Sequence, residues 1–136
     1  MSETLVTFVL GAREYATRLT SVREVVRLEG LAELPGMVPP LAGVLDLRGS
    51  SLPVLDLRVG AAPGDRGDVL VLERSDSTVG VAVDRVRAVV SRGDLAGAGA
   101  GAAEGVLPPY VLEVLRGPHG PVFLVDLEQM VSLTRV

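Results

Sequence analysis

The strongest constraint on the fold of this chain is a short internal repeat. The pentapeptide Val-Leu-Asp-Leu-Arg stands at residues 44–48 and again at residues 54–58. Gly49-Ser50-Ser51 follows the first copy as a turn signal between two apolar runs, and this pattern predicts a β-hairpin. Gly49 can adopt a positive φ, which a tight reversal between strands requires. Pro53 cannot donate to a β-ladder, so we expect it at a strand start or on an unpaired edge.

Short strands separated by turns are predicted along most of the remaining chain. Val69–Leu72 is apolar throughout, which is typical of a strand buried on both faces. The other predicted strands are 5–10 and 14–19 around a turn at 11–13, 86–90 after a bend, and 110–115 and 122–125 around a turn at 117–120. Such short strands at close spacing favour small β-barrels, so the expected fold class is all-β.

One predicted strand has two unequal faces. Val79, Val81 and Val83 alternate with Gly80 and Ala82, so one face of the strand carries branched side chains and the other carries small residues. Small residues on a strand often allow another backbone or lobe to approach closely. We therefore expect Gly80 and Ala82 to contribute to a groove between lobes, with simple core packing as the alternative.

Helical signals are few. Asp126 and Gln129 have the spacing of a capping pair, which predicts a terminal helix over about residues 127–133. Ser21 and Glu24 could cap a short turn in the same way, whereas the valines around them favour a strand. Both alternatives stay open for that segment.

Composition limits the classes of function. The chain has 136 residues, which is the length of one domain, and its formal net charge is −4 with arginine as its only cationic residue. It contains no cysteine. It has only four aromatic residues, two Tyr and two Phe, so it lacks a stacking platform for nucleic acid. No apolar stretch approaches the roughly 20 residues that span a bilayer, and the N-terminus lacks an export signal. We expect a cytoplasmic protein without nucleic-acid binding or direct membrane insertion.

The sequence offers no recognisable catalytic machinery. His119, the only histidine, lies in a Gly-Pro-His-Gly turn, where an exposed side chain is expected. Clustered metal ligands, a nucleophile elbow and a phosphate-binding loop are all missing from the sequence, so we expect no enzyme activity, metal or cofactor. The tripeptide at residues 66–68, Arg-Gly-Asp, is interpreted as part of a turn.

The string from Gly43 to Arg58 resembles the signature of the CheW-like family of bacterial chemotaxis coupling proteins. Weaker matches follow one another in family order along nearly the whole chain, at residues 5–16, 22–25, 34–35, 79–86 and 124–128. The resemblance implies two five-stranded SH3-like barrels packed side by side, with short helices that include one at the C-terminus. It indicates a single CheW-like domain over residues 1–136.

Two Gly/Ala-rich segments, 60–68 and 96–103, are interpreted as flexible connectors. Both suit a two-lobed fold, and the first places a soft lobe division between residues 1–64 and 65–136. Whether a terminal strand crosses between the lobes stays open at this point.

Arg48 is the residue that we single out for partner binding. A guanidinium at a strand end needs an anionic or carbonyl partner if it is partly buried, and the resemblance supplies Glu24 as that partner. The alternative is a solvated arginine at a hairpin tip. Asp46 departs from the family, which usually has Asn there, so a contact that uses the amide donor is in doubt. The expected partner-binding residues are Glu24, Arg48, Gly49, Val22, Val25, Gly80 and Ala82.

The resemblance implies a non-enzymatic adaptor that joins the cytoplasmic tip of methyl-accepting chemoreceptors to the regulatory domain of the chemotaxis histidine kinase. Such an adaptor would lie at membrane-associated receptor arrays. One alternative is a family member that binds receptors without the kinase, or that serves a motility or pilus pathway. A further alternative, from another class, is an all-β protein that binds or hydrolyses a small ligand.

Overall fold

A computed structural model describes the chain except for residues 1–2, 63–64, 75, 98–106 and 135–136. Almost all of its regular structure is β-strand, with two single-turn 3₁₀ helices and one α-helix at the C-terminal end. The strands are β1 (Thr4–Leu10), β2 (Arg13–Arg18), β3 (Glu24–Arg27), β4 (Leu41–Leu47), β5 (Ser50–Asp56), β6 (Asp68–Arg74), β7 (Ser77–Val83), β8 (Arg85–Ser91), β9 (Ala96–Gly97), β10 (Val111–Gly117) and β11 (Gly120–Val125). The helices are η1 (Leu19–Ser21), η2 (Arg92–Asp94) and α1 (Leu127–Thr134).

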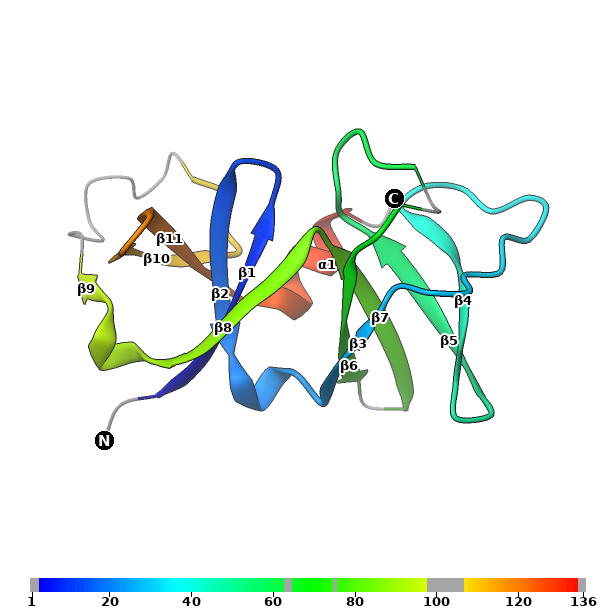
Figure 1. Cartoon of the computed structure of the whole chain (residues 1–136), viewed down its shortest axis with the longest axis horizontal. Helices are drawn as coiled ribbons and strands as arrows, with labels where there is room; N and C mark the ends of the chain where they lie inside the picture. Colours follow the sequence, from blue (N-terminus) through cyan, green and yellow to red (C-terminus); the bar gives the residue numbers. More distant parts are fainter. Residues whose placement is uncertain (1–2, 63–64, 75, 98–106, 135–136) are drawn as a thin grey trace.

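The strands form two sheets that lie side by side and make two lobes (Figure 1). The first lobe has the strand order β8-β1-β2-β11-β10-β9, and the second has the order β3-β6-β7-β5-β4. The predicted all-β class with two lobes and a C-terminal helix is confirmed. The first sheet has a sixth strand beyond the expected five, the two-residue β9.

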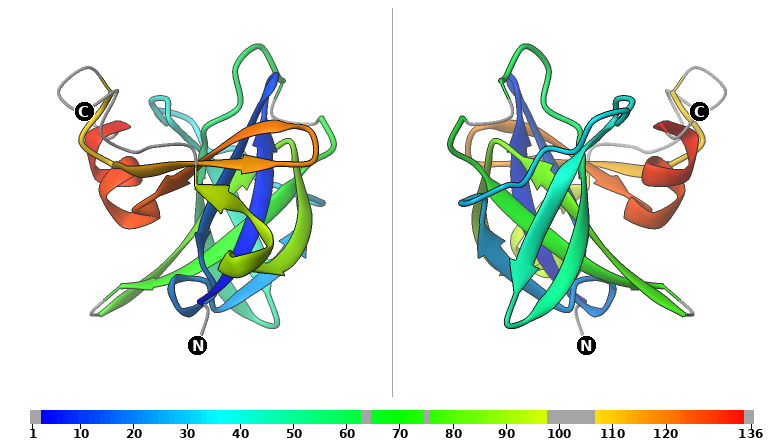
Figure 2. Two further views of the ribbon diagram at one scale, coloured as in Figure 1. Left: turned by 90° about the vertical axis from the view of Figure 1, so that its left-hand side faces the viewer. Right: turned by 90° about the vertical axis from the view of Figure 1, so that its right-hand side faces the viewer.

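Each sheet curls so that its two edges are joined, as the end-on views show (Figure 2). In the second lobe, Ala32 in the segment after β3 exchanges two backbone hydrogen bonds of 2.9 Å with Val44 of β4, at the opposite edge. In the first lobe, β8 continues through η2 into β9, which pairs with β10. Joined edges leave few backbone groups unpaired, which is how small barrels avoid edge-to-edge association.

The lobes do not divide the chain at residue 64. The chain leaves the first lobe after β2, builds the whole second lobe from β3 to β7, and returns to the first lobe with β8. β1 pairs with β8, and β2 pairs in parallel with β11, so both ends of the chain contribute to one sheet. The expected division is therefore corrected, because strand pairing between distant segments sets the lobes.

The hydrophobic core has three parts. One lies inside each lobe, and the largest lies between the lobes, where Val6 and Phe8 of β1 meet Leu70 and Val81 of the second sheet. The buried residues Leu127, Met130 and Val131 place α1 against this junction (Figure 1). A shared core of this size makes the two lobes one folding unit.

β6 is buried on both faces because it lies between two of these cores. Val69 and Val71 face the interior of the second lobe, whereas Leu70 and Leu72 face the junction. The prediction that residues 69–72 form a strand buried on both sides is confirmed. The two faces of β7 differ in the same way, with the valines toward the junction and Ala82 toward the lobe interior.

The signature hairpin forms as predicted, but its turn lies one residue earlier. β4 pairs with β5 in a register that sets Leu47 opposite Ser50, so Arg48 and Gly49 alone make the turn. Their φ values are 50° and 87°, as a two-residue hairpin loop with right-handed twist requires. Pro53 pairs with Val44, and the ladder from β5 to β7 begins only at Val54. Pro53 therefore lies where β5 has no partner on its β7 side.

We expect Gly49→Val to destabilise the fold by about 1–3 kcal/mol, because a branched residue is strained at a φ of 87°. Urea unfolding followed by circular dichroism measures this loss. Ser51→Val is the matched control, since Ser51 is exposed in β5 and valine favours strands. A variant Gly49→Val as stable as Ser51→Val would show that the turn can form without a glycine.

The remaining local predictions are largely confirmed. Asp126 accepts a hydrogen bond of 3.1 Å from the backbone N–H of Gln129, and α1 extends one residue beyond the predicted end. The ambiguous segment near Val22 divides into η1 and β3. Of the second predicted connector, residues 96–97 form β9, while residues 98–103 lie outside the described part of the chain.

Candidate protein-binding surface

Glu24 and Arg48 meet at the surface of the second lobe. Arg48 donates from Nη1 to Oε1 of Glu24 at 3.0 Å and from Nη2 to Oε2 at 2.5 Å, a two-pronged geometry. The Arg48 side chain is 65% exposed and that of Glu24 is 25% exposed. Glu24 belongs to β3 and Arg48 follows β4, the two outer strands of this sheet. The ion pair therefore spans the joined edges of the barrel and holds a guanidinium in one orientation.

The electrostatics of the pair follow from this geometry. The hydrogen bonds from Arg48 lower the pKa of the Glu24 carboxyl, with the positive charge of the guanidinium as a further cause. A lowered pKa in the folded state means that the pair contributes stability above the ordinary pKa of a glutamate. This contribution is lost as the pH falls through the lowered value.

The turn that carries Arg48 is fixed by Asp46. The backbone N–H of Gly49 donates to Oδ1 of Asp46 at 3.0 Å, so this carboxylate supports the reversal of the chain. Arg48 is the only residue other than glycine with a positive φ in the described part of the chain. No local sequence signal indicates this conformation, in which the Arg48 side chain reaches Glu24 of β3.

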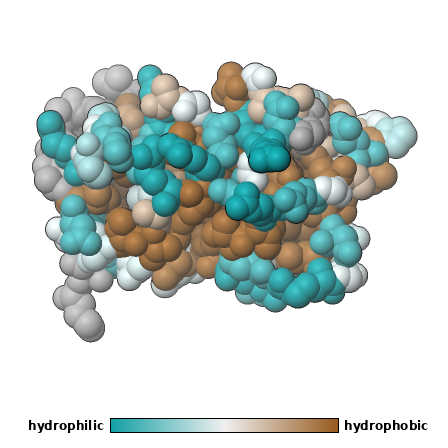
Figure 3. Space-filling model, viewed as in Figure 1, coloured by the Kyte–Doolittle hydropathy of each residue, from teal (hydrophilic) through white to brown (hydrophobic). Residues whose placement is uncertain are grey.

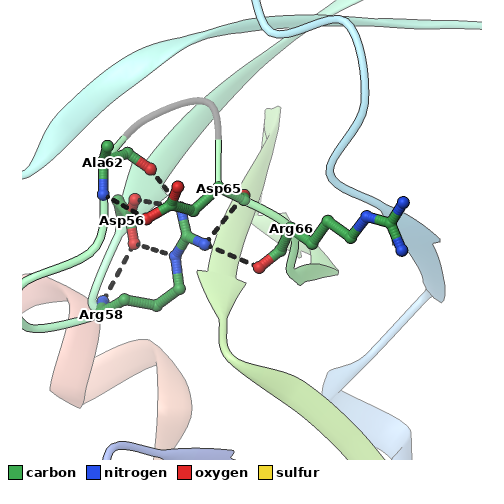
Figure 4. Close-up of polar contacts among 5 residues, drawn as sticks. All are labelled: Asp56, Arg58, Ala62, Asp65 and Arg66. Atoms are coloured by element: carbon green, nitrogen blue, oxygen red, sulfur yellow. Dashed lines mark hydrogen bonds and ion pairs between the residues drawn. The ribbon is translucent and has the colours of Figure 1, made fainter.

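The second copy of the repeat has a different role, although its residues are identical. Arg58 is buried, with its side chain 1% exposed, and it donates from Nε and Nη2 to the two oxygens of Asp56 at 2.9 and 2.8 Å. It also donates to the carbonyl oxygens of Asp65 and Arg66 at 3.0 Å each and of Ala62 at 3.4 Å (Figure 4). Arg58 thus organises the loop between β5 and β6.

Hydrophobic side chains are exposed next to the junction of the lobes. Leu19 is 40% exposed, Val25 is 42% exposed and Val89 is 61% exposed. We call these three residues the apolar strip. Figure 3 shows hydrophobic surface across the middle of one face, where β8 and β3 lie. Val22 is half-buried and packs against the core between the lobes.

Some of the residues expected at a partner surface are exposed in the structure, and others are buried. Glu24, Arg48 and Gly49 lie together at one end of the second lobe, and Val25 is exposed on the same strand as Glu24. Gly80 and Ala82 do not reach the surface. Ala82 is fully buried, and a Cβ on Gly80 would lie 2.6 Å from Cγ1 of Val69 inside the second lobe. Their predicted contact with a groove or partner is wrong, because the small face of β7 serves the lobe interior.

Sequence reasoning missed Leu19 and Val89 as surface residues. Val89 stands opposite the buried Val6 in the ladder between β8 and β1, but β8 is an outer strand of its sheet. Apolar periodicity alone does not distinguish such a residue from a core residue. The exposure of Val89 is therefore apparent only from the folded structure.

The described residues contain no group of three or more His, Cys, Asp or Glu that could hold a metal ion. His119 is exposed in the turn between β10 and β11, as expected. Among the helices of the described part, none is long and apolar enough to cross a membrane.

Similarity to known proteins agrees with this architecture. The chemotaxis protein CheW of Bacillus subtilis (strain 168) is 29% identical over 94 residues, which are 65% of this chain and 60% of that protein. A probable chemotaxis protein CheW of Rhizobium etli is 32% identical over 92 residues, covering 64% of this chain and 59% of that protein. The match therefore spans about three-fifths of the length of these curated relatives.

The fold is similar to that of the scaffolding protein TtCheW from Thermoanaerobacter tengcongensis, with a TM-score of 0.68 and 21% identity. This similarity covers 93% of the present chain and 86% of that one. The CheW-like domain matches residues 4–135, which includes both lobes and the terminal helix. The chain therefore belongs to the CheW-like domain family.

Proposed function

We propose that this protein is a non-enzymatic adaptor of bacterial chemotaxis, which couples the cytoplasmic tip of methyl-accepting chemoreceptors to the regulatory domain of the chemotaxis histidine kinase. It would act in the cytoplasm at receptor arrays. The observation that carries the proposal is an exposed apolar strip together with an ordered surface ion pair, in a chain of the CheW-like family. Two distinct surfaces suit a protein that holds two partners.

The apolar strip is the surface that we assign to the receptor. A helix can bind a groove by placing apolar side chains at spacings of three and four residues into it. Leu19, Val25 and Val89 expose apolar groups from both lobes, so one helix could contact both. Scattered apolar surface residues need no explanation, but a contiguous band is typical of an interaction site.

The Glu24–Arg48 pair is the surface that we assign to the kinase regulatory domain. Glu24 holds the guanidinium by two hydrogen bonds, so little side-chain freedom is lost when a partner binds. Arginine is also frequent among the residues that dominate binding energy. The adaptor contributes geometry, since two linked binding events raise the effective concentration of one partner near the other.

Val25→Asp should weaken receptor binding at least tenfold, which corresponds to about 1.4 kcal/mol, because a carboxylate in an apolar contact loses its hydration. We expect the Val25→Asp variant to stay folded, since Val25 is 42% exposed on an outer strand. Val38→Asp is the matched control, because Val38 is 71% exposed in the connection before β4. Unchanged receptor binding by Val25→Asp would remove the apolar strip from the receptor surface.

The proposal is tested by pull-down with the two candidate partners separately. Immobilised protein should retain both a soluble receptor tip and the kinase regulatory domain. Retention of the receptor tip alone would favour a receptor-binding relative that does not engage the kinase. Retention of neither partner would contradict the adaptor role.

A further inference from the structure

An open concavity lies at one end of the junction between the lobes. The turn between β1 and β2 and the chain after β5 stand on either side of it, at the upper edge of Figure 1. It is an open cleft of about 1120 Å³ that both lobes line. This volume is close to the upper end of the roughly 300–1,000 Å³ of small-molecule pockets, and the open shape leaves room for an extended chain segment.

One wall of the cleft is positively charged, although the protein as a whole has a net charge of −4. Arg13, Arg85 and Arg87 line it, and Glu14 is the single acidic lining residue. Arg13 and Arg85 are exposed and form no ion pair within the described part of the chain. The nearby carboxylate of Asp84 accepts a hydrogen bond of 2.6 Å from the backbone N–H of Gly11.

A β-bulge places one of these arginines. The ladder between β1 and β8 sets Thr7 opposite Ala88 and Phe8 opposite Val86, so Arg87 is the extra residue of β8. Bulges re-aim a side chain relative to the regular alternation of a strand, and they are frequent next to binding sites. Here the bulge lets Arg87 join Arg85 in lining the cleft.

The rest of the cleft is largely apolar and aromatic. Tyr15 stacks on Phe8 with a centroid distance of 5.7 Å and lies 5.8 Å from Phe123. Tyr110 lines the same space. Burial raises the pKa of Tyr15, and the Tyr110 hydroxyl raises it further, while Arg13 opposes the shift. Arg13, Tyr15 and Tyr110 thus all line the same cleft.

Two buried polar atoms of the lining lack hydrogen-bond partners within the described part of the chain. They are Nε of Arg87 and Oε1 of Glu14. Arg87 Nε lies 3.6 Å from the other carboxylate oxygen of Glu14, which is too far for a hydrogen bond. Buried polar groups are rarely left unpaired, and the ion pair of Arg87 with Glu14 therefore leaves one donor and one acceptor of the cleft wall unsatisfied.

We infer that this cleft binds an acidic peptide segment that carries an aromatic or aliphatic side chain. Its carboxylates would lie against Arg13, Arg85 and Arg87, and its apolar side chain against Tyr15, Tyr110 and Phe123. Planar guanidinium groups suit carboxylates through two parallel hydrogen bonds. The inference is independent of the proposed receptor and kinase surfaces, since none of these six residues belongs to the apolar strip or the Glu24–Arg48 pair.

The probe for the test is a fluorescent hexapeptide in which three glutamates alternate with leucine, phenylalanine and leucine. We expect it to bind the protein, with amide shifts in two-dimensional NMR at residues 10–15, 85–87 and 119–123. Binding should weaken at least tenfold in the double variant Arg13→Glu with Arg85→Glu, and also as NaCl is raised. The double variant Arg66→Glu with Arg116→Glu is the control, because it changes the net charge equally at exposed arginines outside the cleft.

Several results would overturn the inference. These are no binding of the hexapeptide, equal binding of a peptide with lysine in place of glutamate, or equal loss in both double variants. Binding of 3-phenylpropionate to the same amides as tightly as the hexapeptide would make the cleft a small-molecule site instead. The Arg13→Glu, Arg85→Glu variant should still retain the receptor tip and the kinase domain. A failure of the peptide-binding inference can therefore be told apart from a failure of the adaptor proposal.

Discussion

Arg58→Ala is expected to destabilise the protein by about 3–5 kcal/mol, the cost of removing one partner from a buried ion pair. The substitution leaves the Asp56 carboxylate, which is 14% exposed, without its guanidinium. It also removes the guanidinium donor from the carbonyl groups of Asp65 and Arg66, whereas the Ala62 carbonyl still accepts from the backbone N–H of Asp65. Chemical unfolding should show this loss, and the melting temperature should fall by about 10–20 °C for a domain of this size.

Arg66→Ala is the matched control for this prediction. Arg66 lies in the same loop, but its side chain is exposed and points away from the cluster around Arg58 (Figure 4). Its removal should change stability by no more than about 0.5 kcal/mol. Arg58→Lys should be intermediate, because a point charge cannot contact Asp56 and the loop carbonyls together. An Arg58→Ala protein as stable as the control would refute the role of Arg58 as the organiser of this loop.

Arg48→Glu should weaken binding of the kinase regulatory domain at least tenfold while circular dichroism and melting remain near those of the unaltered protein. The new carboxylate faces Glu24, so the two side chains repel each other and the guanidinium is lost from the surface. Arg48 is 65% exposed, so its removal costs little in folding. The measurement is a titration of the kinase domain against each variant.

The reciprocal exchange, Glu24→Arg with Arg48→Glu, tests the pair itself. It restores opposite charges across the joined edges of the barrel, so part of the lost affinity should return. Full kinase binding by Arg48→Glu alone would place Arg48 outside the interface. A double variant no better than the single one would keep Arg48 at the surface but would show that its orientation does not depend on Glu24.

Local sequence patterns predicted the strands and turns of this fold better than they predicted which strands pair with each other. The repeat predicted the β4–β5 hairpin, and alternation predicted β7, because turns and strand faces depend on neighbouring residues. The division into lobes depends on ladders such as β2 with β11, which join residues about a hundred positions apart. Nothing in a local pattern encodes such pairings, so the boundary near residue 64 was misplaced.

The two copies of the repeat show the same limit for single residues. Arg48 and Arg58 have identical local sequences, yet one is exposed at a turn and the other is buried under a loop. The difference arises because Arg48 lies in the turn itself, whereas the chain after Arg58 folds back over its guanidinium. Gly80 and Ala82 were misassigned for a similar reason, since periodicity does not say which face of β7 meets the other lobe.

The most direct test of the adaptor account is a bridging experiment. The kinase regulatory domain is immobilised, and a soluble receptor tip is added with and without this protein. An adaptor should retain the receptor tip only when the protein is present, and Val25→Asp and Arg48→Glu should each strongly reduce this retention. Equal retention with and without the protein, or no retention when each partner binds it separately, would contradict the coupling role.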